Sequence, residues 1–152
     1  MVKGPRGVFP GLEVYLFGDG LLYDYIQTGQ SRGATRESEA AKYAELYADP
    51  SYKMSRFRGE VIQRILAQHQ PGTLLDVGTG RGETLEIGRS LGFTCRGTET
   101  VDFLCNEDVV KALLPNLPFE DKSFDTVTCF EVVEHLLPAD VLPALRELAR
   151  VA

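Results

Sequence analysis

The sequence is poor in the residues that build several common kinds of functional site. Of its 152 residues only three are cysteine and two are histidine. The cysteines, Cys95, Cys105 and Cys129, lack the close paired spacing of a zinc site. Lysine and arginine total 16 against 22 acidic residues, which gives a net charge of −6. A protein that depends on broad attraction to nucleic-acid phosphates needs a basic surface, so this composition does not favour that class.

Long apolar runs are also missing. No run approaches the roughly 20 residues that a helix needs to span a bilayer. Lys3 and Arg6 are not followed by the continuous apolar region of a secretory signal. We therefore expect a cytoplasmic protein with no membrane span. A hydrophobic content of 43% and a charged content of 25% are typical of globular chains, and 152 residues predict one domain.

Two helices are predicted in the first half of the chain. Residues 1–34 are rich in glycine, tyrosine and phenylalanine, and we expect an N-terminal extension or lid there. Thr35, followed by acidic residues, is typical of a helix start, and that helix should end near Tyr47, before Asp49-Pro50. A second helix should end before Pro71. Its predicted buried face consists of Met54, Phe57, Val61, Ile62, Ile65 and Leu66.

Short apolar strands and helices alternate in the second half of the chain. The predicted strands are residues 73–77, 93–99, 108–112 and 124–130. The predicted helices are residues 83–92 and about 140–150, the last with Leu142, Leu145, Leu148 and Ala149 facing inward. This alternation predicts an α/β fold with a parallel sheet and helices on both faces. The carboxyl ends of the strands then share one edge, where such sheets bind ligands.

The segment LLDVGTGRGE, residues 74–83, joins the first strand of this sheet to a helix through three alternate glycines. A dinucleotide-binding fingerprint needs a glycine three positions after Gly80, and the chain has Glu83 there. An acid at a helix start also disfavours a pyrophosphate. A nicotinamide-dependent oxidoreductase is therefore disfavoured, and the loop lacks the Gly-Lys-Ser/Thr of a phosphate-binding loop. The loop suits a ligand that approaches the backbone closely and carries little negative charge.

Three segments in order resemble the class I methyltransferases that depend on S-adenosylmethionine. LLDVGTGRG, residues 74–82, resembles the first motif of that family, and Glu99 matches the acid that grips the ribose hydroxyls. LPFEDKSFDTVTCFEVVEHL, residues 117–136, is similar to the block around the family's fourth strand. LRELARV, residues 145–151, is similar to the helix that follows. The resemblance covers about residues 40–152.

This resemblance implies a fold, a cofactor and a set of binding residues. The fold is a Rossmann-like parallel sheet flanked by helices, with strand order 3-2-1-4 and without the usual strands 5–7, in a domain of residues 35–152. A partner chain or an oligomer that completes the sheet stays open. The cofactor is S-adenosyl-L-methionine. The residues implied to bind it are Asp76, Gly78, Thr79, Gly80, Gly82, Glu99, Thr100 and Phe130.

The chemistry of S-adenosylmethionine agrees with these residues. The molecule carries a sulfonium, an ammonium and a single carboxylate, so an acidic pocket suits it. Two ribose hydroxyls donate to one carboxylate in a charge-assisted contact, the role implied for Glu99. Asp76 has two interpretations, a buried acid that accepts from loop amides and a group that helps to hold the ammonium. The family's usual acid after the third strand is replaced by Leu113 or Leu114, so adenine would pack on apolar side chains.

The segment CFEVVEHL places two acids and a histidine where the methyl group is expected. In a helical turn Glu131 would share a face with Glu134 and His135. Similar segments bind a divalent metal in some members of the family and none in others, and a metal is possible but not favoured here. His135 also has the chemistry of a general base for an acceptor hydroxyl, with Glu131 beside it as a second catalytic candidate. A histidine that only hydrogen-bonds the backbone is an equal alternative.

The acceptor is the most open part of this interpretation. We expect methyl transfer to a small-molecule acceptor, with a hydroxyl as the first candidate, and nucleic acid is not favoured. The alternatives are a non-catalytic S-adenosylmethionine-binding or interaction module and a fragment of a nucleic-acid methyltransferase. The region before the sheet, which relatives use to cover the cofactor or hold its carboxylate, contains Tyr23, Tyr25, Tyr43, Tyr47, Arg56 and Arg58. Each of them alone is more typical of helix packing or surface charge.

Overall fold

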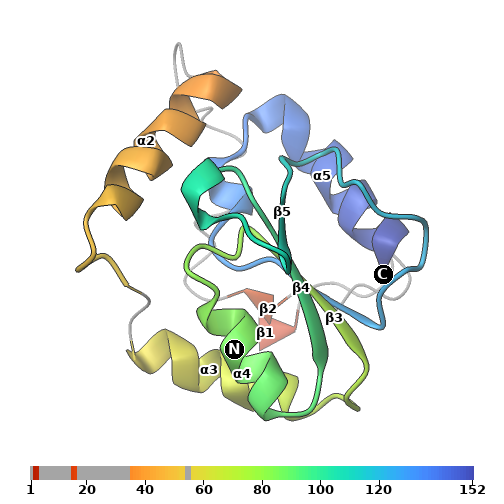
Figure 1. The fold of residues 1–152 in the computed structure, drawn as a ribbon. Coiled ribbons are helices and arrows are strands. Elements are labelled where there is room, and N and C mark those ends of the chain that lie inside the picture. Colours follow the sequence, from red (N-terminus) through yellow and green to blue (C-terminus); the bar gives the residue numbers. More distant parts are fainter. Residues whose placement is uncertain (1, 4–14, 17–34, 54–55) are drawn as a thin grey trace.

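The computed structural model describes residues 2–3, 15–16, 35–53 and 56–152 (Figure 1). β1 (Val2–Lys3) and β2 (Tyr15–Leu16) form a short antiparallel pair. The rest of the expected extension of residues 1–34, and Met54, lie outside the described residues, so the division of the chain at residue 34 stays a prediction. In the described part, no helix is long and apolar enough to cross a membrane.

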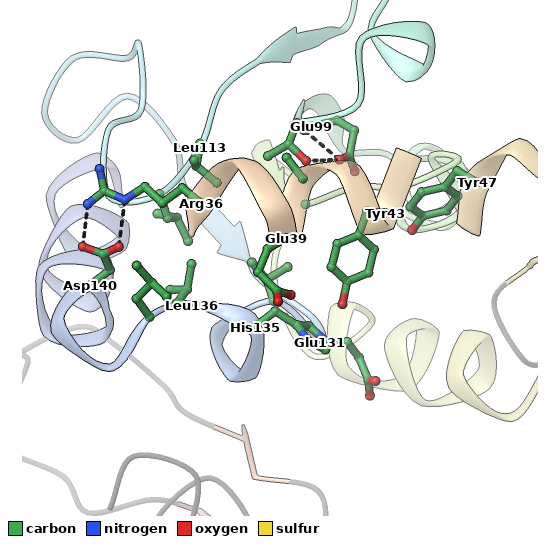
Figure 2. A pocket seen from close by; sticks show the side chains of 16 residues that line it. Arg36, Glu39, Tyr43, Tyr47, Glu99, Leu113, Glu131, His135, Leu136 and Asp140 are labelled. Atoms are coloured by element: carbon green, nitrogen blue, oxygen red, sulfur yellow. Dashed lines mark hydrogen bonds and ion pairs between the residues drawn. The ribbon is translucent and has the colours of Figure 1, made fainter. Parts of the chain in front are cut away.

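Four parallel strands form the sheet that positions the site. They are β3 (Thr73–Val77), β4 (Thr94–Glu99), β5 (Val109–Lys111) and β6 (Thr126–Thr128). Their order is β5-β4-β3-β6, which confirms the predicted order 3-2-1-4. Because all four strands are parallel, the carboxyl ends of β3, β4 and β6 meet at one edge, beside the pocket of Figure 2.

Helices cover both faces of this sheet (Figure 1). α3 (Arg56–Leu66) and α4 (Glu83–Ser90) lie on one face, and α5 (Pro138–Val151) lies on the other. The side chains of β3 alternate between the two layers. Leu74 packs with Ile62 and Leu85 from α3 and α4, whereas Leu75 packs with Val141 and Leu148 from α5. Two short 3-10 turns, Asp102–Leu104 and Val133–His135, follow β4 and β6.

The helix predicted after Thr35 is confirmed as α2 (Arg36–Ala48). Its first turn is fixed by a reciprocal cap, in which the Ser38 amide donates to the Thr35 hydroxyl at 3.2 Å and the Thr35 amide donates to the Ser38 hydroxyl at 2.9 Å. Asp49, just before Pro50, caps the other end. The helix therefore starts and stops where local sequence signals place it.

Two residues predicted to be buried are exposed. Phe57 is 74% exposed and Leu142 is 47% exposed, so their assignment to the inner faces of α3 and α5 was wrong. At about 100° per residue, Phe57 lies on the opposite side of α3 from Ile62 and Leu66, and Leu142 lies opposite the stripe centred on Ala144. Leu148 is buried as predicted, and Leu145 is half-buried against the same core.

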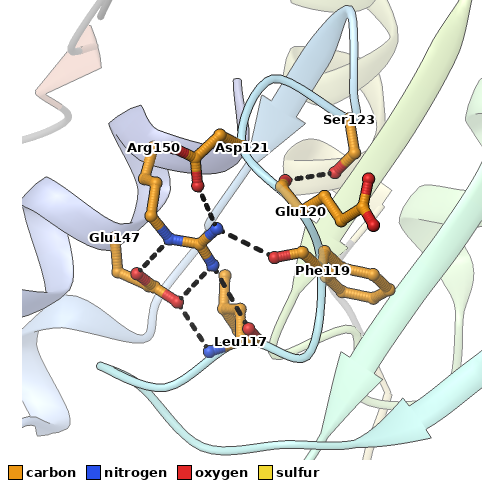
Figure 3. Close-up of polar contacts among 7 residues, drawn as sticks. All are labelled: Leu117, Phe119, Glu120, Asp121, Ser123, Glu147 and Arg150. Carbon is orange, nitrogen blue, oxygen red and sulfur yellow. Dashed lines mark hydrogen bonds and ion pairs between the residues drawn. The ribbon is translucent and has the colours of Figure 1, made fainter.

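Arg150 in α5 fastens the loop that leads into β6 (Figure 3). Its guanidinium donates to the carbonyl oxygens of Leu117 at 3.3 Å and Phe119 at 2.8 Å and to Asp121 Oδ1 at 2.8 Å. It also donates to both carboxylate oxygens of Glu147 at 2.7 Å, which lowers the pKa of Glu147, and Glu147 Oε1 accepts from the Leu117 amide at 2.8 Å. The hydrogen bonds of this one side chain thus hold a loop that contains no helix or strand.

We expect Arg150→Ala to lower the free energy of unfolding by about 1–3 kcal/mol, because the loop carbonyls and Glu147 lose a charged partner that is partly exposed to solvent. Urea denaturation followed by circular dichroism measures the change. Arg146→Ala, at an exposed position of the same helix, is the matched control and should change stability by less than about 0.5 kcal/mol. Equal effects of the two substitutions would contradict the role given to Arg150.

Candidate functional site

The glycine loop after β3 turns the chain tightly at the edge of the sheet. Gly78 donates its amide to the carbonyl oxygen of Thr98 at 2.9 Å. Gly78 and Gly80 have φ angles of 74° and 56°, a region that favours glycine. A Cβ atom on Gly78 would overlap Val132, and one on Gly80 would overlap the hydroxyl of Tyr47. Both conformation and close approach therefore require glycine at these two positions.

Glu99 ends β4 and presents its carboxylate to the pocket (Figure 2). The residue is only 5% exposed. Its Oε2 accepts from the Gly80 amide at 2.8 Å, and its Oε1 accepts from the Thr100 amide at 2.7 Å and the Val101 amide at 3.3 Å. Backbone donors thus hold the buried charge and fix its orientation. Oε2 accepts one such bond, and a carboxylate oxygen has room for a second donor from a ligand.

Asp76 lies behind the glycine loop and does not line the pocket. It is 2% exposed, and the hydroxyl of Thr128 in β6 donates to its Oδ1 at 2.6 Å. Burial raises the pKa of Asp76 to about 6, an effect that the Thr128 hydroxyl partly opposes. Among the described residues no loop amide donates to this carboxylate. Asp76 therefore ties β3 to β6 rather than holding the loop amides.

Helix α2 forms one wall of the pocket (Figure 2). Arg36, Glu39, Tyr43 and Tyr47 line it from one face of the helix. The rings of Tyr43 and His135 pack edge to face with centroids 5.2 Å apart. Burial raises the pKa of Tyr47 to about 12, so its hydroxyl stays protonated and can donate. Arg36 and Glu39 were not predicted from the sequence, although their spacing from the two tyrosines is the signal of a shared face.

The segment after β6 forms the opposite wall. Glu131 has a φ of 58° and precedes the 3-10 turn Val133–His135, so the prediction that Glu131 shares a helical turn with Glu134 and His135 was wrong. The carboxylate of Glu131 instead pairs with Arg58 Nη2 at 2.9 Å. His135 Nε2 lies 3.9 Å from Glu134 Oε1. Within the described residues, no three acidic, histidine or cysteine side chains form a group that could hold a metal ion.

One end of the pocket is closed by an ion pair between α2 and α5. Arg36 Nε and Nη2 donate to the two carboxylate oxygens of Asp140 at 2.8 and 2.6 Å (Figure 2). Asp140 is 8% exposed and lies in the first turn of α5, where the helix dipole favours an anion. The hydrogen bonds from Arg36 lower the pKa of Asp140. Asp140 was not predicted as a site residue, because no sequence motif marks it.

Only some of the predicted cofactor residues line this pocket. Gly78, Glu99 and Thr100 do, together with Leu113 and Leu114 at the place of the family's usual acid. Of the two catalytic candidates, both His135 and Glu131 line it as well. The predicted cofactor residues outside the lining are Asp76, Thr79, Gly80, Gly82 and Phe130. Phe130 packs against the core beneath α3 and α4. The binding roles of all these residues stay predictions.

The charge of the pocket limits what it can bind. Its empty space of about 710 Å³ includes the part that opens to solvent. Four lining residues are acidic: Glu39, Glu99, Glu131 and Asp140. Among the described lining residues Arg36 is the one lysine or arginine, and Asp140 neutralises it. The pocket therefore suits a ligand with positive charge.

Comparison with known sequences agrees with this geometry. The profile of a methyltransferase domain matches residues 75–152. This chain belongs to the methyltransferase domain family. The matched residues run from within β3 to the end of α5 and so include the strand ends and the segment after β6, whereas α2 and its pocket wall precede them. The family assignment made from the glycine loop and the block after it is confirmed.

Among curated proteins, this methyltransferase-domain chain is 29% identical to norajmaline N-methyltransferase of Rauvolfia serpentina over an alignment of 171 residues. The alignment covers 97% of this chain and 51% of the relative, so the chain spans about half the length of that protein.

Two solved structures show the same fold. The PH0226 protein of Pyrococcus horikoshii OT3 superposes with a TM-score of 0.62 at 23% identity, over 72% of this chain and 56% of that one. A candidate S-adenosyl-L-methionine-dependent methyltransferase of Methanococcus maripaludis superposes with a TM-score of 0.56 at 20% identity, over 81% of this chain and 63% of that one. The Rossmann-like methyltransferase fold predicted from the sequence is thereby confirmed.

The raised pKa of Asp76 makes stability depend on pH. The folded state holds the proton of Asp76 up to a pH of about 6, whereas the unfolded chain releases it near 3.8. Between these values the folded state binds more protons, so this residue lowers stability as pH rises through the window. We expect the free energy of unfolding of Asp76→Asn, relative to wild type, to rise by on the order of 2–3 kcal/mol from pH 4 to pH 7.

Urea denaturation at intervals of one pH unit measures this difference for Asp76→Asn. Glu120→Gln, which neutralises an exposed acid, is the control and should show no such trend. A difference between wild type and Asp76→Asn that stays constant with pH would show that Asp76 titrates as it does in the unfolded chain.

Proposed function

We propose that this chain is the cofactor-binding part of an S-adenosylmethionine-dependent methyltransferase that acts on a small-molecule acceptor. The observation that carries the proposal is Glu99, a buried carboxylate held by backbone amides and turned into a pocket beside the glycine loop. Burying the Glu99 carboxylate away from water costs free energy. Hydrogen bonds from a pair of ligand hydroxyls would compensate part of that cost. The acidic lining of the pocket and membership of the methyltransferase domain family support the same function.

The residues of the pocket fit S-adenosylmethionine. Glu99 would accept from the two ribose hydroxyls, one at the free acceptor site of Oε2 and the other at Oε1, where it would replace the Thr100 hydroxyl that donates at 3.1 Å. Leu113 and Leu114 would pack on adenine in place of the family's acid. Arg36, Lys42 and Arg58 pair with Asp140, Glu39 and Glu131, so among the described residues Glu99 is the lining acid without a cationic partner and supplies the negative charge that suits a sulfonium and an ammonium. When bound, S-adenosylmethionine supplies an activated methyl group, so the protein has mainly to position the acceptor, an effect worth roughly 7–11 kcal/mol.

The acceptor would lie between α2 and the segment after β6. His135 lines that region and packs edge to face with the Tyr43 ring, so its imidazole is the group that would take a proton from the acceptor. A hydroxyl is one acceptor of this kind. The N-methyltransferase name of the plant relative supports a nitrogen as another. The acidic lining favours both over a phosphate-bearing nucleic acid.

Three further proposals concern the chain as a whole. Residues 1–34 form an extension or lid beside a domain of residues 35–152. A partner chain or a second copy pairs with the sheet, which in the described residues ends at β6 on one side and β5 on the other. The protein is cytoplasmic. The position of α2 over the pocket supports the first of these, because the lid would continue from its N-terminal end.

The ribose contact gives a direct test by titration calorimetry with S-adenosylhomocysteine. We expect the wild-type protein to bind it and Glu99→Ala to lose roughly tenfold or more in affinity, because two hydroxyls lose a charged acceptor. Glu99→Gln should fall between them. Glu86→Ala, at an exposed position of α4, is the control and should bind as wild type does.

An unchanged dissociation constant in folded Glu99→Ala would place the ribose elsewhere. Absence of binding by the folded wild-type protein, or tighter binding of NAD, would overturn the proposed function.

Transfer of label from methyl-tritiated S-adenosylmethionine separates the acceptor classes. We expect labelling of small amines or phenols and none of RNA or duplex DNA. A chelator should leave the rate unchanged, because Glu131 is engaged by Arg58 rather than grouped with Glu134 and His135. His135→Ala should lower kcat about 100-fold or more for an acceptor that must lose a proton.

His69→Ala, which replaces the other histidine of the chain, is the control for His135→Ala and should keep full activity. Binding of the cofactor without label in any acceptor would favour the non-catalytic module. Loss of activity on chelation would restore the metal interpretation of Glu131, Glu134 and His135.

A further inference from the structure

The C-terminal end of α2 is capped by a side chain from a different part of the chain. The last carbonyl groups of a helix have no partner within the helix, and α2 has no basic residue in its last turn. Arg81 supplies the missing donors. Its Nη2 donates to the carbonyl oxygens of Tyr47 at 2.7 Å and Asp49 at 2.9 Å, and its Nε donates to that of Tyr52 at 3.0 Å.

Arg81 belongs to the glycine loop. Its neighbour Gly80 donates the amide hydrogen that Glu99 accepts at 2.8 Å, so one turn of backbone faces the buried acid on one side and α2 on the other. The Tyr47 ring lies against both parts of this turn. Its hydroxyl sits where a side chain on Gly80 would stand, and the Arg81 guanidinium lies 5.7 Å from its ring centroid. A shift of α2 would therefore be transmitted to the loop.

The other end of α2 is held separately, by the ion pair of Arg36 with Asp140. Between these two attachments the helix presents Tyr43 and Tyr47 to the pocket. α2 has no buried residue of its own, so little apolar packing keeps it in place. Its position depends on a small number of charged contacts, and Arg81 makes the one that reaches the glycine loop.

We propose that Arg81 is a positioning residue that couples the glycine loop to α2 and so keeps the tyrosine wall over the cofactor. This inference rests on the proposed function, because the cofactor is what the wall would cover. Ligand contact with Glu99 and the glycine loop steadies Arg81, Arg81 steadies the end of α2, and the closed wall slows departure of the ligand. The planar guanidinium of arginine has several N–H donors in fixed directions, so it can donate to three carbonyl groups at once. A lysine ammonium cannot match this geometry.

The experiment measures the affinity and the dissociation rate of S-adenosylhomocysteine in wild type, Arg81→Ala and Arg81→Lys. We expect Arg81→Ala to raise the dissociation constant roughly tenfold, mainly through faster dissociation, because the wall opens more often. Arg81→Lys should recover part of the loss through its charge. Arg89→Ala, which removes an exposed arginine that pairs with Asp108 away from the pocket, should change neither quantity.

Hydrogen exchange of residues 36–48 tests the coupling itself. In wild type, saturating S-adenosylhomocysteine should slow exchange along α2. In Arg81→Ala at saturation this slowing should be lost, while peptides from β3 and β4 stay protected. If Arg81→Ala does not fold, the hydrogen exchange of residues 36–48 is compared between wild type and Arg81→Lys instead.

Different results would refute the proposed function and the coupling through Arg81. If folded wild type binds no S-adenosylhomocysteine, the proposed function is wrong. If wild type binds and Arg81→Ala shows the same dissociation rate and the same protection of residues 36–48, the proposed function stands and the coupling through Arg81 is refuted. Equal loss of affinity in Arg81→Ala and Arg89→Ala would also refute it, since the effect would then be one of surface charge.

Discussion

A hydrogen bond between the Gly80 amide and the Glu99 carboxylate joins the two strand ends on which the site is built. It forms because β3 and β4 are parallel neighbours in a register that sets Val77 opposite Thr98. The backbone therefore leaves β3 and β4 at neighbouring positions on the same edge of the sheet. A slip of one residue would turn Glu99 to the other face of the sheet, away from the pocket and its amide donors. The glycines allow the close approach, and the register makes it possible.

The walls of the pocket come from segments far apart in the sequence and are held by charge rather than by apolar packing. α2 lies across the strand ends through its contacts with Asp140 at one end and with Arg81 at the other. The segment after β6 is turned by the left-handed backbone of Glu131, which pairs with Arg58. Because the lining acids outnumber the cations, the pocket attracts a cation even where its individual ion pairs are exposed and weak.

Most of the fold could be predicted from periodicity, because residues of the core repeat with the period of their element. The strands Thr73–Val77 and Thr94–Glu99 and the order of the sheet are of this kind. Phe57 and Leu142 were misplaced, because each was assigned to the inner face for its apolar side chain although its angle on the helix places it opposite the buried stripe. β6 is also shorter than the apolar run 124–130, which continues into the pocket segment.

The site was harder to predict than the fold for a physical reason. Glu99 and the glycines carry a fixed spacing, whereas the wall of α2 faces an empty space and leaves no apolar pattern in the sequence. The positive φ of Glu131 could not be foreseen either, because most such positions are glycine or asparagine. Asp140 and Arg36 lie in ordinary helix-start sequences, and only the tertiary structure brings them together.

The order of strands in the sheet also has a consequence for how the chain folds. β3 pairs with β4 across a short stretch that contains only α4, with Thr73 opposite Thr94, but it pairs with β6 across a much longer one, with Leu74 opposite Thr126. Closing a longer loop costs more chain entropy before any contact forms. We therefore expect the β3–α4–β4 unit, which carries the glycine loop and Glu99, to form first. Half of the ligand site would take shape early, and β6 with α5 would dock onto it afterwards.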